Sequence, residues 1–354
     1  MAATKQPMAP ITLGRGLPEE GRAAGERELL AFVEAALVRA GWHLPYLLVV
    51  DYYIALKTQR FVILLGHEGK GKRHLAQTFA ETLVGSNSDQ LASIQVRPPQ
   101  PGVGSKPGLF NDIYERFSWI KFVEFLERAA APENSGKAYF LCLEDLSSFD
   151  IETYFELFLR RDGSGQYRLA LPGYPPERWP VVPSGLFICG TVNADERCYR
   201  LSDAVLGRVG SIEFSVDSLP GRRVETNLLG VPPVGLQRLM LAPVPQSGQQ
   251  ALLRLRALLG QQPSVDLQPS PALSRLIEAS GVCFDVQAQD YIWRYVANSF
   301  DSEGYGFFER HDRLRNYRLA LDFQVTRQAL VRLRCRAPLE IQAAIEAHLE
   351  TLFG

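Results

Sequence analysis

Apolar positions recur at helical spacing where the patterned part of the chain begins. This spacing runs from Glu26 to Ala40 and predicts an amphipathic helix there. A second helix is expected at about residues 46–56. The first 25 residues have neither this period nor the apolar stretch of a secretory signal, so they are expected to be a disordered lead-in.

Short, continuous apolar runs follow, and they suit strands that are buried on both faces of a parallel sheet. The predicted strands are residues 60–65, 93–96, 138–143, 185–190 and 211–214. Helices are predicted between them at residues 74–83, 119–130 and 151–161. The proline-rich segment 97–108 is expected to be a surface loop. Strands that alternate with helices indicate right-handed crossovers, and therefore an α/β fold with a parallel sheet.

Beyond about residue 240 the pattern predicts helices only. The expected helices are residues 252–259, 272–279, 288–300, 318–333 and 339–352. The chain is therefore divided into a lead-in (1–25), an α/β core (26–238) and an all-helical domain (239–354).

A glycine-rich motif follows the first predicted strand and opens a helix. It fits the phosphate-binding pattern GxxxxGK, with its eighth position occupied by arginine. Its glycines let backbone N–H groups wrap a phosphate, and the lysine reaches the β and γ oxygens. The alternative is a glycine-rich turn before a basic helix. The candidate nucleotide-binding residues are Gly66, His67, Glu68, Gly69, Lys70, Gly71, Lys72, Arg73 and His74.

Arg73 stands where this motif normally has a serine or threonine hydroxyl that binds magnesium. A guanidinium has only hydrogen-bond donors and a fixed positive charge, so Arg73 is no metal ligand. Two consequences remain open. Either Arg73 replaces magnesium electrostatically beside the phosphates, or it points to solvent while the loop has ceased to bind nucleotide.

Further candidate catalytic residues follow the predicted strands. Glu144 and Asp145 end a buried strand, where such folds place a carboxylate for the metal and a carboxylate that polarises water. Asn193 follows the next strand and is a candidate to orient that water, and Arg208 is a candidate arginine finger. The alternatives are a helix-capping acidic pair, a turn asparagine and a surface ion pair, respectively.

Composition narrows the function classes. Among 354 residues, Lys and Arg number 38 and Asp and Glu 39, so no global field draws the chain to nucleic acid or an anionic membrane. The longest apolar run, residues 46–65, contains Asp51, Lys57 and Arg60 and is not expected to span a bilayer. The cysteines are scattered without CxxC spacing, which is typical of reduced thiols in a cytoplasmic protein.

Several stretches together resemble the AAA+ domain of McrB-like bacterial restriction and defence NTPases. They are the lead into the glycine-rich loop (51–66), Leu143-Glu-Asp-Leu with the following helix, and Leu186-Phe-Ile-Cys-Gly-Thr-Val-Asn-Ala-Asp with 201–208. They resemble the phosphate loop, the Walker B strand, and sensor 1 with the arginine-finger segment. The tail 319–325 is similar to the helical lid of that family. The resemblance implies ATP or GTP binding, assembly into a ring and a McrC-like partner.

The chain departs from that family at positions that matter for hydrolysis. Lys70 and Arg73 replace Thr and Ser, Glu144-Asp145 reverses Asp-Glu, and Cys283-Phe-Asp-Val stands where sensor 2 arginine is expected. The first hypothesis is therefore a degenerate subunit that binds ATP or GTP with weak or no hydrolysis and acts by assembly. The alternatives are a working motor that drives a McrC-like nuclease, and a scaffold without nucleotide. Magnesium binding, with Glu144 as its candidate ligand, is doubtful.

Overall fold

The computed structural model describes residues 25–95, 109–146, 151, 160–161, 167–170, 175–193, 209–214, 235–260, 269–333 and 339–351. The expected lead-in 1–25, apart from Gly25, and the expected loop 97–108 lie outside these ranges. Among the described helices none is both long and apolar enough to cross a bilayer.

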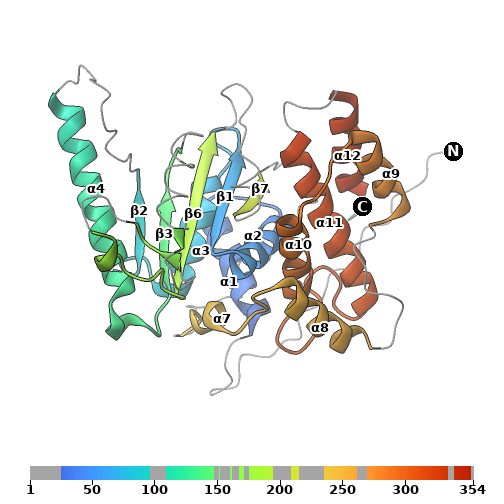
Figure 1. Cartoon of the computed structure of the whole chain (residues 1–354), viewed down its shortest axis with the longest axis horizontal. Coiled ribbons are helices and arrows are strands. Elements are labelled where there is room, and N and C mark those ends of the chain that lie inside the picture. Colours follow the sequence, from blue (N-terminus) through green and yellow to red (C-terminus); the bar gives the residue numbers. More distant parts are fainter. Residues whose placement is uncertain are drawn as a thin grey trace.

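The centre of the molecule is a five-stranded sheet in the order β2-β3-β6-β1-β7, and neighbouring strands pair in parallel (Figure 1). The strands are β1 Phe61–Gly66, β2 Leu91–Ile94, β3 Tyr139–Leu143, β6 Leu186–Asn193 and β7 Gly210–Glu213. All six residues of β1 and all five of β3 are buried, as the continuous apolar runs predict. Strand β1 therefore lies inside the sheet, with β6 on one side and β7 on the other.

Helices follow the strands and then continue alone to the C-terminus. The helices of the core are α1 Glu26–Arg39, α2 Tyr46–Thr58, α3 Lys72–Val84, α4 Leu109–Ala130 and the short α7 Arg238–Leu241. The later helices are α8 Gly248–Leu259, α9 Pro271–Ser280, α10 Val286–Asn298, α11 Arg313–Leu333 and α12 Leu339–Thr351. Two 3-10 turns lie at Pro132–Asn134 and Pro176–Arg178. The predicted α/β fold with a parallel sheet and a helical C-terminal region is confirmed.

One prediction is wrong. The helix expected over 151–161 does not reach its predicted end, because β4 (Arg160–Arg161) pairs antiparallel with β5 (Tyr167–Arg168). Pairing with a partner strand overrides the helical preference that the local pattern suggests. Ile151 is helical, and residues 152–159 lie outside the described ranges.

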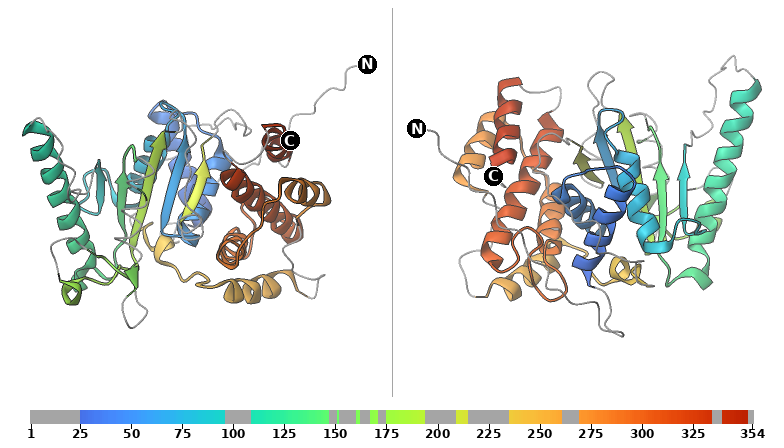
Figure 2. Two further views of the ribbon diagram at one scale, coloured as in Figure 1. Left: turned by 45° about the horizontal axis from the view of Figure 1, so that its top comes forward. Right: turned by 180° about the vertical axis from the view of Figure 1, so that it is seen from behind.

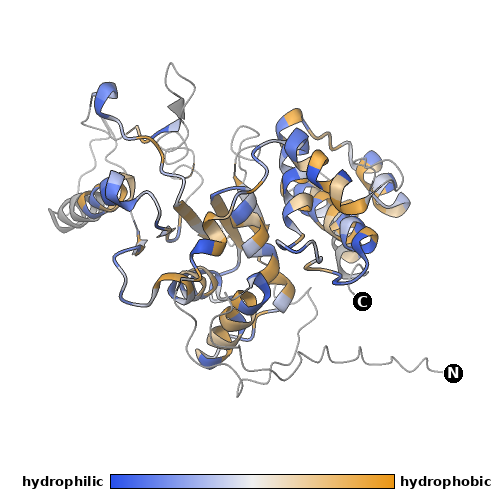
Figure 3. Ribbon diagram, turned by 90° about the horizontal axis from the view of Figure 1, so that it is seen from below, coloured by the Kyte–Doolittle hydropathy of each residue, from blue (hydrophilic) through white to orange (hydrophobic). Residues whose placement is uncertain are grey.

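Alternate residues of each strand face opposite sides of the sheet and enter two apolar clusters. Val62, Leu64 and Ile212 pack with residues of α1, α2 and α3, whereas Ile63 and Leu65 pack with residues of α4. A third cluster joins α8, α9, α10 and α11. The helical region lies beyond β7, at the opposite end of the sheet from α4 (Figure 2). The strands of the sheet are coloured as hydrophobic in Figure 3, whereas the helices carry both hydrophobic and hydrophilic residues.

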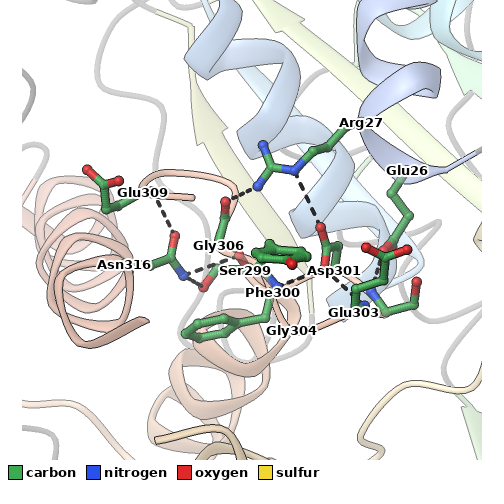
Figure 4. A network of polar contacts seen from close by, with 12 residues as sticks. Glu26, Arg27, Ser299, Phe300, Asp301, Glu303, Gly304, Gly306, Glu309 and Asn316 are labelled. Carbon is green, nitrogen blue, oxygen red and sulfur yellow. Dashed lines mark hydrogen bonds and ion pairs between the residues drawn. The ribbon is translucent and has the colours of Figure 1, made fainter. Parts of the chain in front are cut away.

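A loop of the helical region docks onto the start of α1 through polar contacts (Figure 4). Arg27 donates to Asp301 at 3.4 Å and to the Gly306 carbonyl, and Glu26 accepts from the Ser302 N–H at 2.8 Å. Asn316 of α11 holds the same loop from the other side, because its side chain bonds the backbone of Ser299, Phe308 and Glu309. Glu26 also accepts from Tyr53 and Lys57 of α2.

A buried ion pair makes a second connection between the helical region and the core. Arg327 of α11 lies 3.2 Å from the carboxylate of Asp51 in α2, and both side chains are at most 3% exposed. Tyr295 of α10 donates to the other carboxylate oxygen at 2.7 Å. Burial raises the pKa of Asp51, and the Arg327 charge and the Tyr295 hydroxyl oppose that shift. Asp51, which interrupts an apolar run of sequence, is thus a partner of a distant arginine.

Removing either partner of this pair should leave a buried charge alone. Asp51→Leu and Arg327→Met are each expected to lower the free energy of unfolding by about 3–5 kcal/mol. The double variant should lose clearly less than the sum of the two, because it leaves neither charge unpaired. Urea unfolding of the four proteins measures this coupling, and strictly additive losses would contradict it.

Candidate functional site

The carboxyl ends of β1, β3 and β6 meet at one edge of the sheet, and the candidate residues gather there. Gly66, the last residue of β1, is the register partner of Asn193, the last residue of β6. Glu144 and Asp145 follow β3 directly. Parallel strands carry their carboxyl ends to the same edge, so this convergence follows from the topology.

The glycine-rich loop has the backbone conformation that phosphate binding needs. Gly69 and Gly71 have positive φ angles of 73° and 95°, a region that glycine enters without a steric penalty. Gly71 is the residue that precedes α3, so the N-terminus of this 13-residue helix faces the loop. The exposed His67 and Glu68 and the partly exposed Lys70 complete the turn. An anion in the loop would meet backbone N–H groups and the positive end of the helix.

Lys72 begins α3, and its ammonium group turns back to the loop. It donates to the carbonyl of Gly66 at 2.7 Å and to that of His67 at 2.6 Å. The residue is only 5% exposed. The charge of Lys72 is therefore held beside the backbone of the loop. A phosphate bound there would replace the two carbonyl groups with its own oxygens as the acceptors of Lys72.

Arg73 reaches the first of the two acidic residues. Its Nε lies 3.0 Å from Glu144 Oε1, and Ser93 of β2 donates to the same oxygen. The Arg73 side chain is 56% exposed, and a pair of that kind contributes at most about 1 kcal/mol to stability. The contact therefore matters for where charge is placed and not for stability. The guanidinium of Arg73 is paired with the carboxylate that was expected to bind a metal ion.

This geometry does not fit magnesium. Magnesium needs a near-octahedral shell of oxygen ligands, and it is usually held by a loop hydroxyl with a carboxylate. Here the loop position supplies a cation, and Glu144 is already paired with it.

Asp145 and Asn193 contact each other. The Asn193 amide donates to Asp145 Oδ1 at 3.2 Å. Asp145 has a φ of 50°, which costs a non-glycine residue roughly 1–3 kcal/mol and is found mostly at sites where surrounding structure imposes it. Thr191 imposes it here, because its hydroxyl accepts from the Asp145 N–H at 3.0 Å and its carbonyl from the Leu146 N–H at 2.8 Å.

The structure adds three residues that the sequence pattern did not single out: Ser93, Thr191 and Trp42. Trp42 stacks on His74, with ring centroids 4.1 Å apart. Its ring also lies against Gly71, where an added Cβ would come within 2.8 Å of it. Burial, and then the charge of Arg73, lower the pKa of His74. Ser93 and Thr191 are polar residues within strands, which gives no local signal of a site.

Two remaining sequence candidates have different outcomes. Arg208 lies outside the described residues. Cys283 is exposed, and Asp285 caps α10 by accepting from the Ala288 N–H at 2.7 Å. The start of α10 therefore presents a capping carboxylate at the place where the resemblance leads one to expect a sensor 2 arginine.

Comparisons with known proteins give little beyond this geometry. No protein-family model matches the chain. No curated protein matches it. Among solved structures, the chain is similar to PCH-2 of C. elegans, with 11% sequence identity and a TM-score of 0.23. The match covers 92% of this chain and 67% of that one. So low a TM-score carries no argument. The fold class stands on the five-stranded parallel sheet, the helices that follow its strands and the helical C-terminal region.

The two left-handed glycines of the loop offer a test of its construction. Alanine at either position is forced into an unfavourable φ, which costs about 1–2 kcal/mol. Gly69→Ala meets no atom within 4 Å, whereas Gly71→Ala also collides with Trp42. Gly71→Ala is therefore expected to lose about 2–5 kcal/mol in urea unfolding and Gly69→Ala about 1–2 kcal/mol. Equal losses would show that Trp42 does not pack on the loop.

Proposed function

We propose that this chain is an AAA+ subunit that binds ATP or GTP at the Gly66–His74 loop without magnesium and hydrolyses it weakly or not at all. The observation that carries the proposal is the 3.0 Å ion pair between Arg73 and Glu144. Of the two readings of Arg73 that the sequence leaves open, this contact favours the one in which its charge stays inside the site. The guanidinium then supplies, from the protein, the positive charge that magnesium supplies elsewhere.

Nucleotide binding is supported by parts of the loop that hold phosphate without a metal. Gly69 and Gly71 shape the backbone, the N-terminus of α3 faces it, and Lys72 lies at its edge. Backbone N–H groups, a helix N-terminus and a lysine are sufficient to bind a phosphate anion. Adenine and guanine are not distinguished by these contacts, so both nucleotides belong to the proposal.

The contacts of the two carboxylates, Glu144 and Asp145, support weak hydrolysis. Glu144 is paired with Arg73, and a carboxylate held in this way is not free to orient a metal-bound water. Asp145 is one methylene shorter than the glutamate of the family and is tied into a strained turn by Thr191. An attacking water would therefore meet a base that is set back from the usual position.

The resemblance to McrB-like NTPases supports a biological role for this chain. In that role it is a ring-forming subunit of a restriction or anti-phage defence complex. A McrC-like protein is the corresponding partner, and Arg208 is the proposed arginine finger toward a neighbouring subunit. Acting by assembly requires only that nucleotide binding fixes the conformation of the subunit. Turnover is not needed for that role.

A working NTPase is the second candidate. It is favoured by the contact of Asp145 with Asn193, which keeps a carboxylate and an amide together where an attacking water would be oriented. Steady-state release of phosphate from ATP and GTP, with Lys72→Ala as the blank, separates the two candidates. Turnover at rates ordinary for AAA+ motors would reject the static site.

Magnesium dependence is the direct test of the proposed site. Titration of fluorescent ATP and GTP analogues should give the same affinity with magnesium and with EDTA, and Lys72→Ala should weaken binding at least about tenfold. Arg73→Thr restores the hydroxyl and frees Glu144, so its binding should become dependent on magnesium. If the affinity of the wild type falls sharply in EDTA, the proposed role of Arg73 is contradicted. If neither analogue binds, the hypothesis of a scaffold without nucleotide is favoured instead.

A further inference from the structure

We infer that Arg327 of α11 is a positioning residue for the glycine-rich loop, although it lies in the helical region and outside that loop. A continuous series of contacts runs from its guanidinium through β7 to the loop lysine. The part of this inference that concerns nucleotide affinity rests on the proposed function, and the part that concerns the loop itself does not.

The first contact fixes the end of strand β7. Besides its ion pair with Asp51, Arg327 donates through Nη1 to the backbone carbonyl of Glu213 at 2.8 Å. Its guanidinium also lies over the ring of Phe323, 4.8 Å from the centroid. Since Glu213 is the last residue of β7, the guanidinium holds this strand end to α2 and α11 together.

The second contact passes from β7 to the glycine-rich loop. Phe214, the next residue, donates its N–H to the Leu65 carbonyl at 2.5 Å. Its own carbonyl lies so close to Gly66 that a Cβ added there would come within 2.7 Å of it. Gly66 in turn accepts from Lys72 Nζ at 2.7 Å. A shift of the β7 end therefore moves the first glycine of the loop and the carbonyl that holds its lysine.

This arrangement predicts coupling in both directions. Loss of the Arg327 contacts loosens the loop and weakens nucleotide binding, although the contacts described for Arg327 are made to Asp51, Glu213 and Phe323 and not to the loop. By thermodynamic reciprocity, bound nucleotide strengthens the docking of α11 on β7. The helical region then acts on the site by fixing β7.

Arg294 of α10 provides a matched control. It also bridges the helical region to the core, because it donates to the Thr58 carbonyl, to Gln59 Oε1 at 3.3 Å and to the Pro245 carbonyl at 3.2 Å. Its side chain is 15% exposed. These contacts reach the end of α2 and the segment before α8, and none of them is made to β7.

The test compares Arg327→Met with Arg294→Met by hydrogen–deuterium exchange without nucleotide. Amides of residues 61–75 should exchange about tenfold faster in Arg327→Met and at the wild-type rate in Arg294→Met. If Arg327→Met fails to fold, the double variant Asp51→Leu/Arg327→Met removes the unpaired charge and is expected to show the same local increase. Equal exchange in this segment for the wild type and the folded Arg327 variant would overturn the inference.

Nucleotide affinity gives the second readout. Fluorescent ATP and GTP analogues should bind the Arg327 variant about tenfold more weakly and Arg294→Met within about twofold of the wild type. Wild-type protein that binds neither analogue rejects the proposed function, while the exchange comparison still decides the role of Arg327. Unchanged affinity in an Arg327 variant whose loop exchanges faster would overturn the part of the inference that concerns nucleotide.

Discussion

Parallel pairing of β1 with β6 on one side and β7 on the other is the constraint on which the candidate site depends. It aligns Gly66 with Asn193 and sets the end of β7 beside the glycine-rich loop. Glu144, Asp145 and Asn193 come from distant parts of the chain and reach the glycine-rich loop through the pairing of these strands. The contacts of Lys72 with Gly66 and His67, in contrast, are local in sequence. Both faces of β1 are covered by apolar side chains, so the strand is fixed by packing as well as by its hydrogen bonds.

The polar contacts of the molecule divide into two kinds with different consequences. Arg73 and Glu144 form a partly exposed pair that contributes little stability but decides which charge stands at the loop. Asp51 and Arg327 form a fully buried pair, and the burial makes each charge dependent on the other. The first pair concerns the chemistry of the site, whereas the second concerns the relation between the helical region and the sheet.

The sequence predicts most of the fold because its signals are local. Continuous apolar runs mark β1 and β3, and the glycine pattern marks the turn into α3. The pairing of β4 with β5 is missed because each strand is only two residues long, and Arg160 and Arg161 carry no strand signal of their own. At the site, the glycine-rich motif locates the loop, and the apolar run before Glu144 locates that residue. The roles of Ser93 and Thr191 exist only in the folded arrangement of β2, β3 and β6. The sequence also leaves open where the side chain of Arg73 points, because its partner Glu144 comes from a distant segment.

The contact between Arg73 and Glu144 also links the charges of the two residues. A serine or threonine at residue 73 would withdraw the only counterion that the described structure gives Glu144, and the reversed order of the two carboxylates would remain. That single change would thus replace a fixed positive charge with a hydroxyl and leave the shorter carboxylate, Asp145, in second place. Because the guanidinium and the carboxylate compensate each other, a substitution at either residue alters the net charge beside the loop.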